Sequence, residues 1–123
     1  MRCERGSITV VAAAVIAVIV VTTMGVADVG KALVARAHAQ QAADAAALAA
    51  AQELALPTGR VPAEVAGDLA ARNGATLTAC TCASTATGAV VEVRVAVGSL
   101  LLVPGALSAT ATARAVVDLP EQP

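Results

Sequence analysis

The sequence predicts an α+β protein in which one long N-terminal helix carries a small mixed head. Two patterns support this fold class. An uncharged apolar run from Ile8 to Val26 continues, without proline, into an alanine-rich stretch that ends near Leu54. Nearer the C-terminus, apolar and polar residues alternate, which is typical of strands with one buried face. We therefore expect a long helix, a second short helix and a three-stranded antiparallel sheet.

The run from Ile8 to Val26 is predicted to cross a membrane. It contains no charged residue, and a spanning helix needs about 20 apolar residues. Arg2 and Arg5 precede the run and favour a cytoplasmic N-terminus, although two basic residues also follow it. The expected layout is a cytoplasmic leader over residues 1–7, a transmembrane helix over 8–27, a helical stalk over 28–56, an extracytoplasmic α+β head over 57–119 and a tail over 120–123.

A cleaved signal peptide is the alternative interpretation of the same run. Gly25 and Ala27 are small residues at the spacing that signal peptidase requires. Cleavage after Ala27 would release a secreted or membrane-tethered extracytoplasmic binding module. The apolar run is longer than the usual signal core and the helical pattern continues beyond it, so we favour an uncleaved anchor.

The stalk is a strong helix former because alanine has the highest helix propensity. Within it, Asp28 and Lys31 are spaced to meet on the helix surface, as are Gln40 and Asp44. Small side chains would let another helix or a sheet approach the backbone closely. The predicted helix-packing face includes Asp28, Gln41, Asp44, Ala47 and Leu48.

The head follows a helix break at residues 56–59, which read Leu-Pro-Thr-Gly. Pro62 suits the first turn of a second helix, and Gly74 suits the residue that caps its C-terminus. Strands are expected over 76–82, 89–97 and 107–117, with a turn over 84–88 and with Leu77, Ala79, Val91, Val93 and Val95 facing inward. The apolar connection over 98–105 has no evident role in such a sheet.

Composition argues against several functions. The net charge is −1, aromatic residues are absent and the basic residues form no block, which argues against nucleic-acid binding. No nucleophile stands near the lone His38 in sequence, and no phosphate-binding loop or catalytic triad is evident. We expect no enzymatic activity, no cofactor and no metal, and we expect His38 to be a solvated residue of the stalk.

Cys80 and Cys82 leave two chemical states open. Residues i and i+2 of an extended strand lie about 6.5 Å apart, which is unfavourable for a disulfide, whereas a turn would allow one. The pair therefore either forms a disulfide or remains as two thiols, one of which could bond another subunit.

The stalk also carries a recognisable pattern. Ala27-Asp28-Val29-Gly30 follows the span, Ala35-Arg36 comes next, and residues 41–50 read Gln-Ala-Ala-Asp-Ala-Ala-Ala-Leu-Ala-Ala. This pattern, with Arg5-Gly6-Ser7 leading into the span, resembles the N-terminal segment of TadE/TadG-like proteins of the Flp (tight-adherence) pilus-assembly system. The chain as a whole is most similar to the small actinobacterial TadE-like proteins.

The resemblance implies a pseudopilin-like fold and a non-enzymatic role as a minor pseudopilin or assembly component of a Flp-type pilus or secretion system. Its implied partners are the lipid bilayer and other pilus-assembly or secretion membrane proteins, with homo- or hetero-oligomers forming through the alanine-rich helix. It also implies processing by a prepilin peptidase between Gly6 and Ser7. Pilin-like substrates carry a glutamate five residues into the mature chain, where this sequence has Val11.

Overall fold

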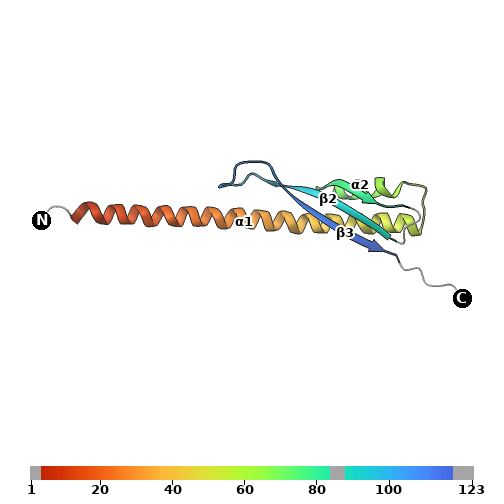
Figure 1. The fold of residues 1–123 in the computed structure, drawn as a ribbon, viewed down its shortest axis with the longest axis horizontal. Coiled ribbons are helices and arrows are strands. Elements are labelled where there is room, and N and C mark those ends of the chain that lie inside the picture. The colour runs from red at the N-terminus through yellow and green to blue at the C-terminus, as the bar shows by residue number, and fades with distance from the viewer. Residues whose placement is uncertain (1–3, 84–87, 118–123) are drawn as a thin grey trace.

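The computed structural model describes residues 4–83 and 88–117 and confirms the α+β fold. Its elements are α1 (Glu4–Ala55), α2 (Pro62–Arg72), β1 (Thr76–Thr81), β2 (Gly88–Gly98) and β3 (Leu107–Val116). The strands form one antiparallel sheet in the order β1-β2-β3. The head lies along the C-terminal half of α1, whereas the N-terminal half projects beyond it (Figure 1). The predicted turn, apart from Gly88, and the predicted tail lie outside the described residues.

Helix α1 runs through 52 residues without a break. Gly25 and Gly30 do not interrupt it, and residues 4–7 of the expected leader already belong to its first turns. In its apolar half, the hydroxyl groups of Thr22 and Thr23 donate to carbonyl oxygens of the preceding turn. These bonds satisfy the hydroxyl groups of Thr22 and Thr23 within the helix itself.

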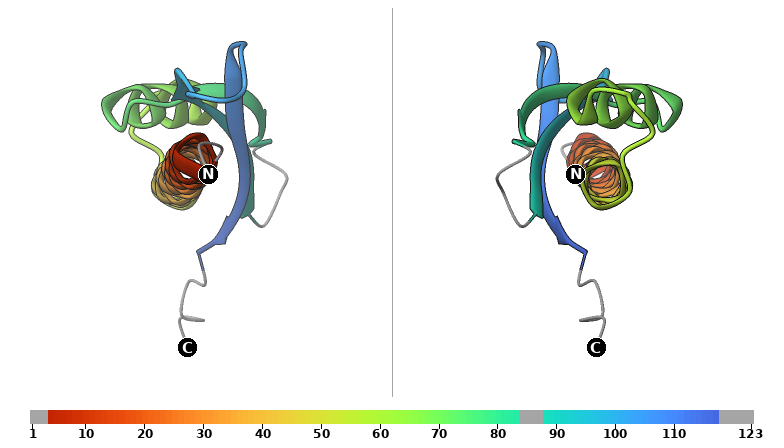
Figure 2. Two further views of the ribbon diagram at one scale, coloured as in Figure 1. Left: turned by 90° about the vertical axis from the view of Figure 1, so that its left-hand side faces the viewer. Right: turned by 90° about the vertical axis from the view of Figure 1, so that its right-hand side faces the viewer.

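The core is formed between one face of α1 and the inner face of the sheet. Seen end-on, the sheet curves around one side of α1, and α2 lies beside it (Figure 2). The largest fully buried side chains are only Val91 and Val93. Because the helix face consists of alanine, the sheet can approach the helix backbone closely. The buried core residues are Ala39, Ala42, Ala43, Ala46, Ala47, Ala50, Ala51, Ala66, Ala70, Ala75, Ala89, Val91, Val93, Val95, Ala111 and Ala113.

Helix α2 ends as its sequence predicts. Gly74 has φ +67°, a left-handed conformation that glycine adopts without steric cost. The amide of Gly74 donates to the carbonyl of Ala71, and the amide of Ala75 donates to that of Ala70. These two bonds form a Schellman motif, which turns the chain directly from α2 into β1.

Strand β1 contains an irregularity that corrects one prediction. Leu77 pairs with Val93, but the next paired residue, Ala79, faces Glu92, so Thr78 is an extra residue in the strand. Such a bulge moves the following side chains to the opposite face. Ala79 is consequently exposed, not buried, while Leu77 and Cys80 pack against the core.

Candidate functional site

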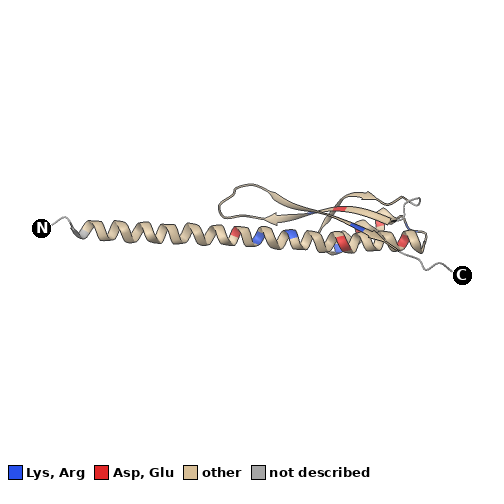
Figure 3. Ribbon diagram, turned by 60° about the horizontal axis from the view of Figure 1, so that its bottom comes forward, with Lys and Arg blue, Asp and Glu red and all other residues tan. Residues whose placement is uncertain are grey.

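The N-terminal half of α1 makes an apolar surface that the head does not cover. Its side chains from Ile8, 75% exposed, to Val26, 74% exposed, face outward. In Figure 3, the coloured Lys, Arg, Asp and Glu residues lie on the half of the molecule that carries the head. By length and composition, α1 is the one helix among the described residues that could cross a membrane.

Asp28 and Lys31 tie the β2–β3 loop to α1 just after this surface ends. The two carboxylate oxygens of Asp28 accept hydrogen bonds from the amides of Leu101 and Leu102, each at 2.8 Å. The Nζ atom of Lys31 donates to the carbonyl oxygen of Ser99 at 2.9 Å. We name this set of three bonds the loop clamp. Asp28 and Lys31, which the sequence placed together on the helix surface, thus also bind a loop that is distant in the sequence.

The loop clamp explains the charge state of Asp28. Hydrogen bonds from the amides of Leu101 and Leu102, assisted by the positive charge of Lys31, hold the pKa of the Asp28 carboxyl below its usual range against the opposing effect of desolvation. The carboxylate therefore stays ionised at neutral pH. Sequence reasoning missed this site because the bonded residues are 68 to 74 positions apart. The one available signal was an acid–base pair at the end of an uncharged run.

The five residues of the predicted helix-packing face do not share one face in the structure. Asp28 and Ala47 are buried beneath the head, whereas Gln41, Asp44 and Leu48 are exposed on the opposite side. The pairing of Gln40 with Asp44 is present, at 3.0 Å. The reason for the split is that the stalk is rich in alanine all around, so its sequence does not reveal which alanines the sheet covers.

The side of α1 that faces away from the head continues the apolar character of the span into the stalk. Val29 and Leu33 are large apolar residues that are exposed there. Their spacing places them in one row with Val26 and with the exposed Asp44 and Leu48. We call this row the outer face of α1; its residues are Val26, Val29, Leu33, Ala37, Gln41, Asp44 and Leu48.

A second buried carboxylate shapes the turn at the other end of the stalk. Glu53 accepts hydrogen bonds from the amide and hydroxyl of Thr58 and from the amide of Arg60. These bonds, the Thr58 hydroxyl first among them, hold the pKa of Glu53 below its usual range. The predicted helix break at Pro57 is therefore fixed by a side chain of the helix that it ends.

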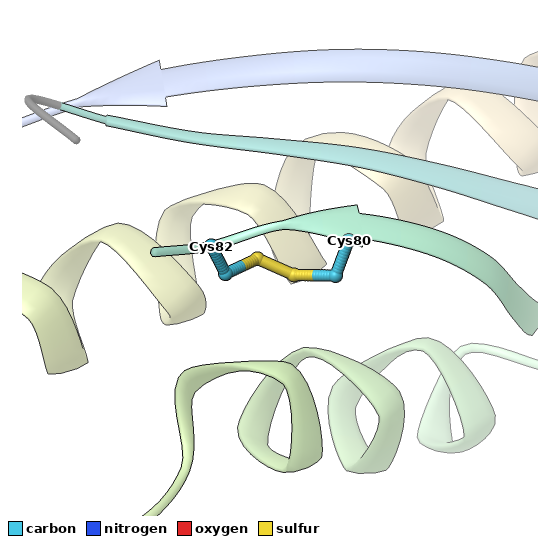
Figure 4. The surroundings of a disulfide bond; sticks show 2 residues. All are labelled: Cys80 and Cys82. Atoms are coloured by element: carbon cyan, nitrogen blue, oxygen red, sulfur yellow. A yellow bond between two sulfur atoms is a disulfide. The ribbon is translucent and has the colours of Figure 1, made fainter. Parts of the chain in front are cut away.

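The structure joins Cys80 and Cys82 by a disulfide whose Cα atoms are 5.4 Å apart. Strand β1 ends at Thr81, directly before Cys82, and the two cysteines are closer than the about 6.5 Å that separates residues i and i+2 of a regular strand. Both side chains lie on the side of β1 that faces α2 (Figure 4) and pack against the core. Of the two states left open by the sequence, the structure has the disulfide.

The remaining predicted site residues are exposed. Gly6, Ser7 and Val11 lie on the first turns of α1 and are exposed. His38 is exposed on the stalk beside the C-terminal turn of α2, as expected. Among residues 6–83 and 88–117, no group of three or more His, Cys, Asp or Glu side chains is placed to hold a metal ion.

Comparison with known families points to the same segment as the sequence pattern. Residues 6–53 match the model of the Tad family, described as "Putative Flp pilus-assembly TadE/G-like". Comparisons with curated proteins and with solved structures gave no match. The matched segment comprises the apolar half of α1, the loop clamp residues on the helix and almost the whole stalk. The similarity to the TadE/G-like Flp pilus-assembly family thus covers residues 6–53 of the 123 residues of the chain.

Proposed function

We propose that the protein is a single-pass membrane component of a Flp-type pilus or secretion machine and that it acts by packing, as a minor pseudopilin or assembly factor, without enzymatic activity. The observation that carries this proposal is the division of α1. Its apolar half is left bare by the head, and its second half supports the head. This division falls within the segment that matches the Tad family.

The proposed topology places the N-terminus in the cytoplasm, the membrane span at residues 8–27, and the stalk and the head outside. The arginines before the span support this orientation. The Cys80–Cys82 disulfide supports it independently, because structural disulfides persist in oxidising compartments outside the cytoplasm.

The structure changes which surface we assign to partners. The alanine row of the stalk is covered by the protein's own sheet, so it cannot receive a neighbouring helix while the head is folded. The outer face remains open, and Val29 and Leu33 make it apolar next to the span. We therefore assign other pilus-assembly membrane proteins, or a second copy of the chain, to the span and the outer face.

Photocrosslinking in cells that assemble the pilus tests this assignment. A photoreactive residue at Leu33, on the outer face, should yield adducts with pilus-assembly membrane proteins or with a second copy. The same residue at Thr112, which is exposed on the sheet away from α1, should yield far less. Equal yields at both positions would refute the assignment, and release of the chain from membranes by alkaline carbonate would refute membrane anchoring.

The mass of the chain in the membrane fraction distinguishes the proposed anchor from the alternative, a module that signal peptidase releases after Ala27. Retention of residues 8–27 in the mature protein is expected. A mature N-terminus at Asp28 would instead establish the released module.

A further inference from the structure

The loop between β2 and β3 is more apolar than its place in the head requires. No charged residue occurs from Val95 to Ala113. At the tip, Leu101, Leu102 and Val103 are exposed. A hairpin needs only a few polar residues to reverse direction, so three large apolar side chains in water call for another explanation.

The position of the loop along α1 supplies an explanation for these exposed apolar side chains. A Cβ atom built on Gly25 would lie 3.7 Å from Cδ1 of Leu102, and Asp28 binds the amides of Leu101 and Leu102. The loop tip therefore lies level with the last turn of the predicted span. Figure 1 shows it beside α1, on the side of the head nearest the N-terminal half.

The length of the span places the bilayer surface at this level. At a rise of 1.5 Å per residue, α1 extends about 26 Å from Ile8 to Gly25, while the hydrocarbon core of a bilayer is about 30 Å thick. Because this length of helix is shorter than the hydrocarbon core is thick, the hydrocarbon region extends at least close to Gly25. The side chains beside Gly25 are therefore at the boundary between lipid and water.

The loop clamp removes the main obstacle to contact between a loop and lipid. Irregular backbone is excluded from lipid because its amides and carbonyls lack partners there. Here Asp28 accepts from the amides of Leu101 and Leu102, and Lys31 donates to the carbonyl of Ser99. Both charged groups lie on the helix side of the loop. Leu101 and Val103 remain exposed, and Leu102 is exposed in part, with one methyl group toward Gly25.

We propose that the β2–β3 loop is a second membrane contact, in which Leu101, Leu102 and Val103 insert into the bilayer interface beside the span while the loop clamp satisfies the amides of Leu101 and Leu102. The occupant of this apolar surface is lipid. The inference rests on the proposed membrane anchoring by residues 8–27 and adds a contact that fixes the head against the bilayer surface.

The absence of aromatic residues makes a direct test practical, since a single introduced tryptophan is the only fluorophore of the chain. Three variants of the full chain are reconstituted into phosphatidylcholine liposomes, with or without brominated acyl chains. Leu101→Trp reports on the loop. Leu56→Trp is the matched water control, since Leu56 is 71% exposed at the far end of the stalk. Ile16→Trp reports on the span.

The expected result is a blue-shifted emission and loss of intensity with brominated lipid for Leu101→Trp and Ile16→Trp, and neither effect for Leu56→Trp. Quenching of Ile16→Trp without quenching of Leu101→Trp would overturn the loop contact while leaving the anchor intact. A blue shift of Leu101→Trp without quenching would show that protein covers the loop, which also overturns the inference. Absence of quenching at Ile16→Trp would refute membrane anchoring itself.

Discussion

Ala47→Leu tests whether the alanine row of the stalk is the floor of the head. The substitution replaces a methyl group with an isobutyl group at a residue that is only 1% exposed. Leucine is nearly as good a helix former as alanine, so α1 itself should persist. The added atoms have no free space beneath the sheet, and overpacking of this kind costs about 1–3 kcal/mol.

This cost is large relative to the stability of a small head, because folded domains are stable by only about 0.05–0.15 kcal/mol per residue. A loss of about 1–3 kcal/mol raises the ratio of open to closed states by about 5- to 150-fold. Amide hydrogen exchange in β2, around Val91 and Val93, reports this ratio directly. We therefore expect the protection factors of β2 to fall by that amount in the full-length protein.

Ala37→Leu is the matched control, since Ala37 is exposed on the outer face of the same helix. Surface substitutions of this kind usually change stability by less than about 0.5 kcal/mol. Unchanged protection of β2 in Ala47→Leu, or an equal loss in both variants, would show that the sheet does not pack on this row as described.

Two further predictions follow from the polar contacts. Because the pKa of Asp28 is lowered in the folded state, its contribution to holding the loop is complete above the pKa of an unfolded aspartate, about 3.9, and is lost as the pH falls through the lower folded value. In the wild type, the amide protection of Leu101 and Leu102, corrected for intrinsic exchange, should fall over this acidic range. In Asp28→Asn it should be low at every pH. A pH-dependent profile that survives in the variant would assign the effect to another group. The Cys80–Cys82 bond closes a very short loop, so its reduction should cost no more than about 2 kcal/mol. Alkylation followed by mass spectrometry should modify neither cysteine before reduction and both afterwards, and modification of both without reductant would contradict the disulfide.

The strands and helices were predictable because each has a clear local signal. The alternating valines of β2 face the core as predicted, and Pro62 and Gly74 mark the limits of α2. The error at Ala79 arose from the bulge at Thr78, which shifts the inward-facing set by one residue without any distinctive residue type. Local pattern therefore predicted the elements but not the irregularity within one of them.

The candidate site was harder to predict, for two physical reasons. The buried face of α1 could not be recognised because alanine, which fits both water and a tight core, occurs on every side of the stalk. The loop clamp depends on contacts between Asp28 and residues 101 and 102, and such pairing is set by how the hairpin folds back along the helix. The sequence showed an unexplained apolar loop and an unexplained acid–base pair, but not that they meet.

The continuity of α1 has a mechanical consequence for a membrane-anchored protein. A helix of 52 residues is about 78 Å long, and each residue advances it by about 1.5 Å and turns it by about 100°. No hinge separates the span from the stalk. The number of residues from the span to the stalk residues under the sheet therefore determines how the sheet is oriented about the helix axis. A neighbour that turns or pulls the span would turn or lift the head by the same amount. In the proposed topology, α1 would therefore transmit torque and axial force between the bilayer and the head as one rigid helix.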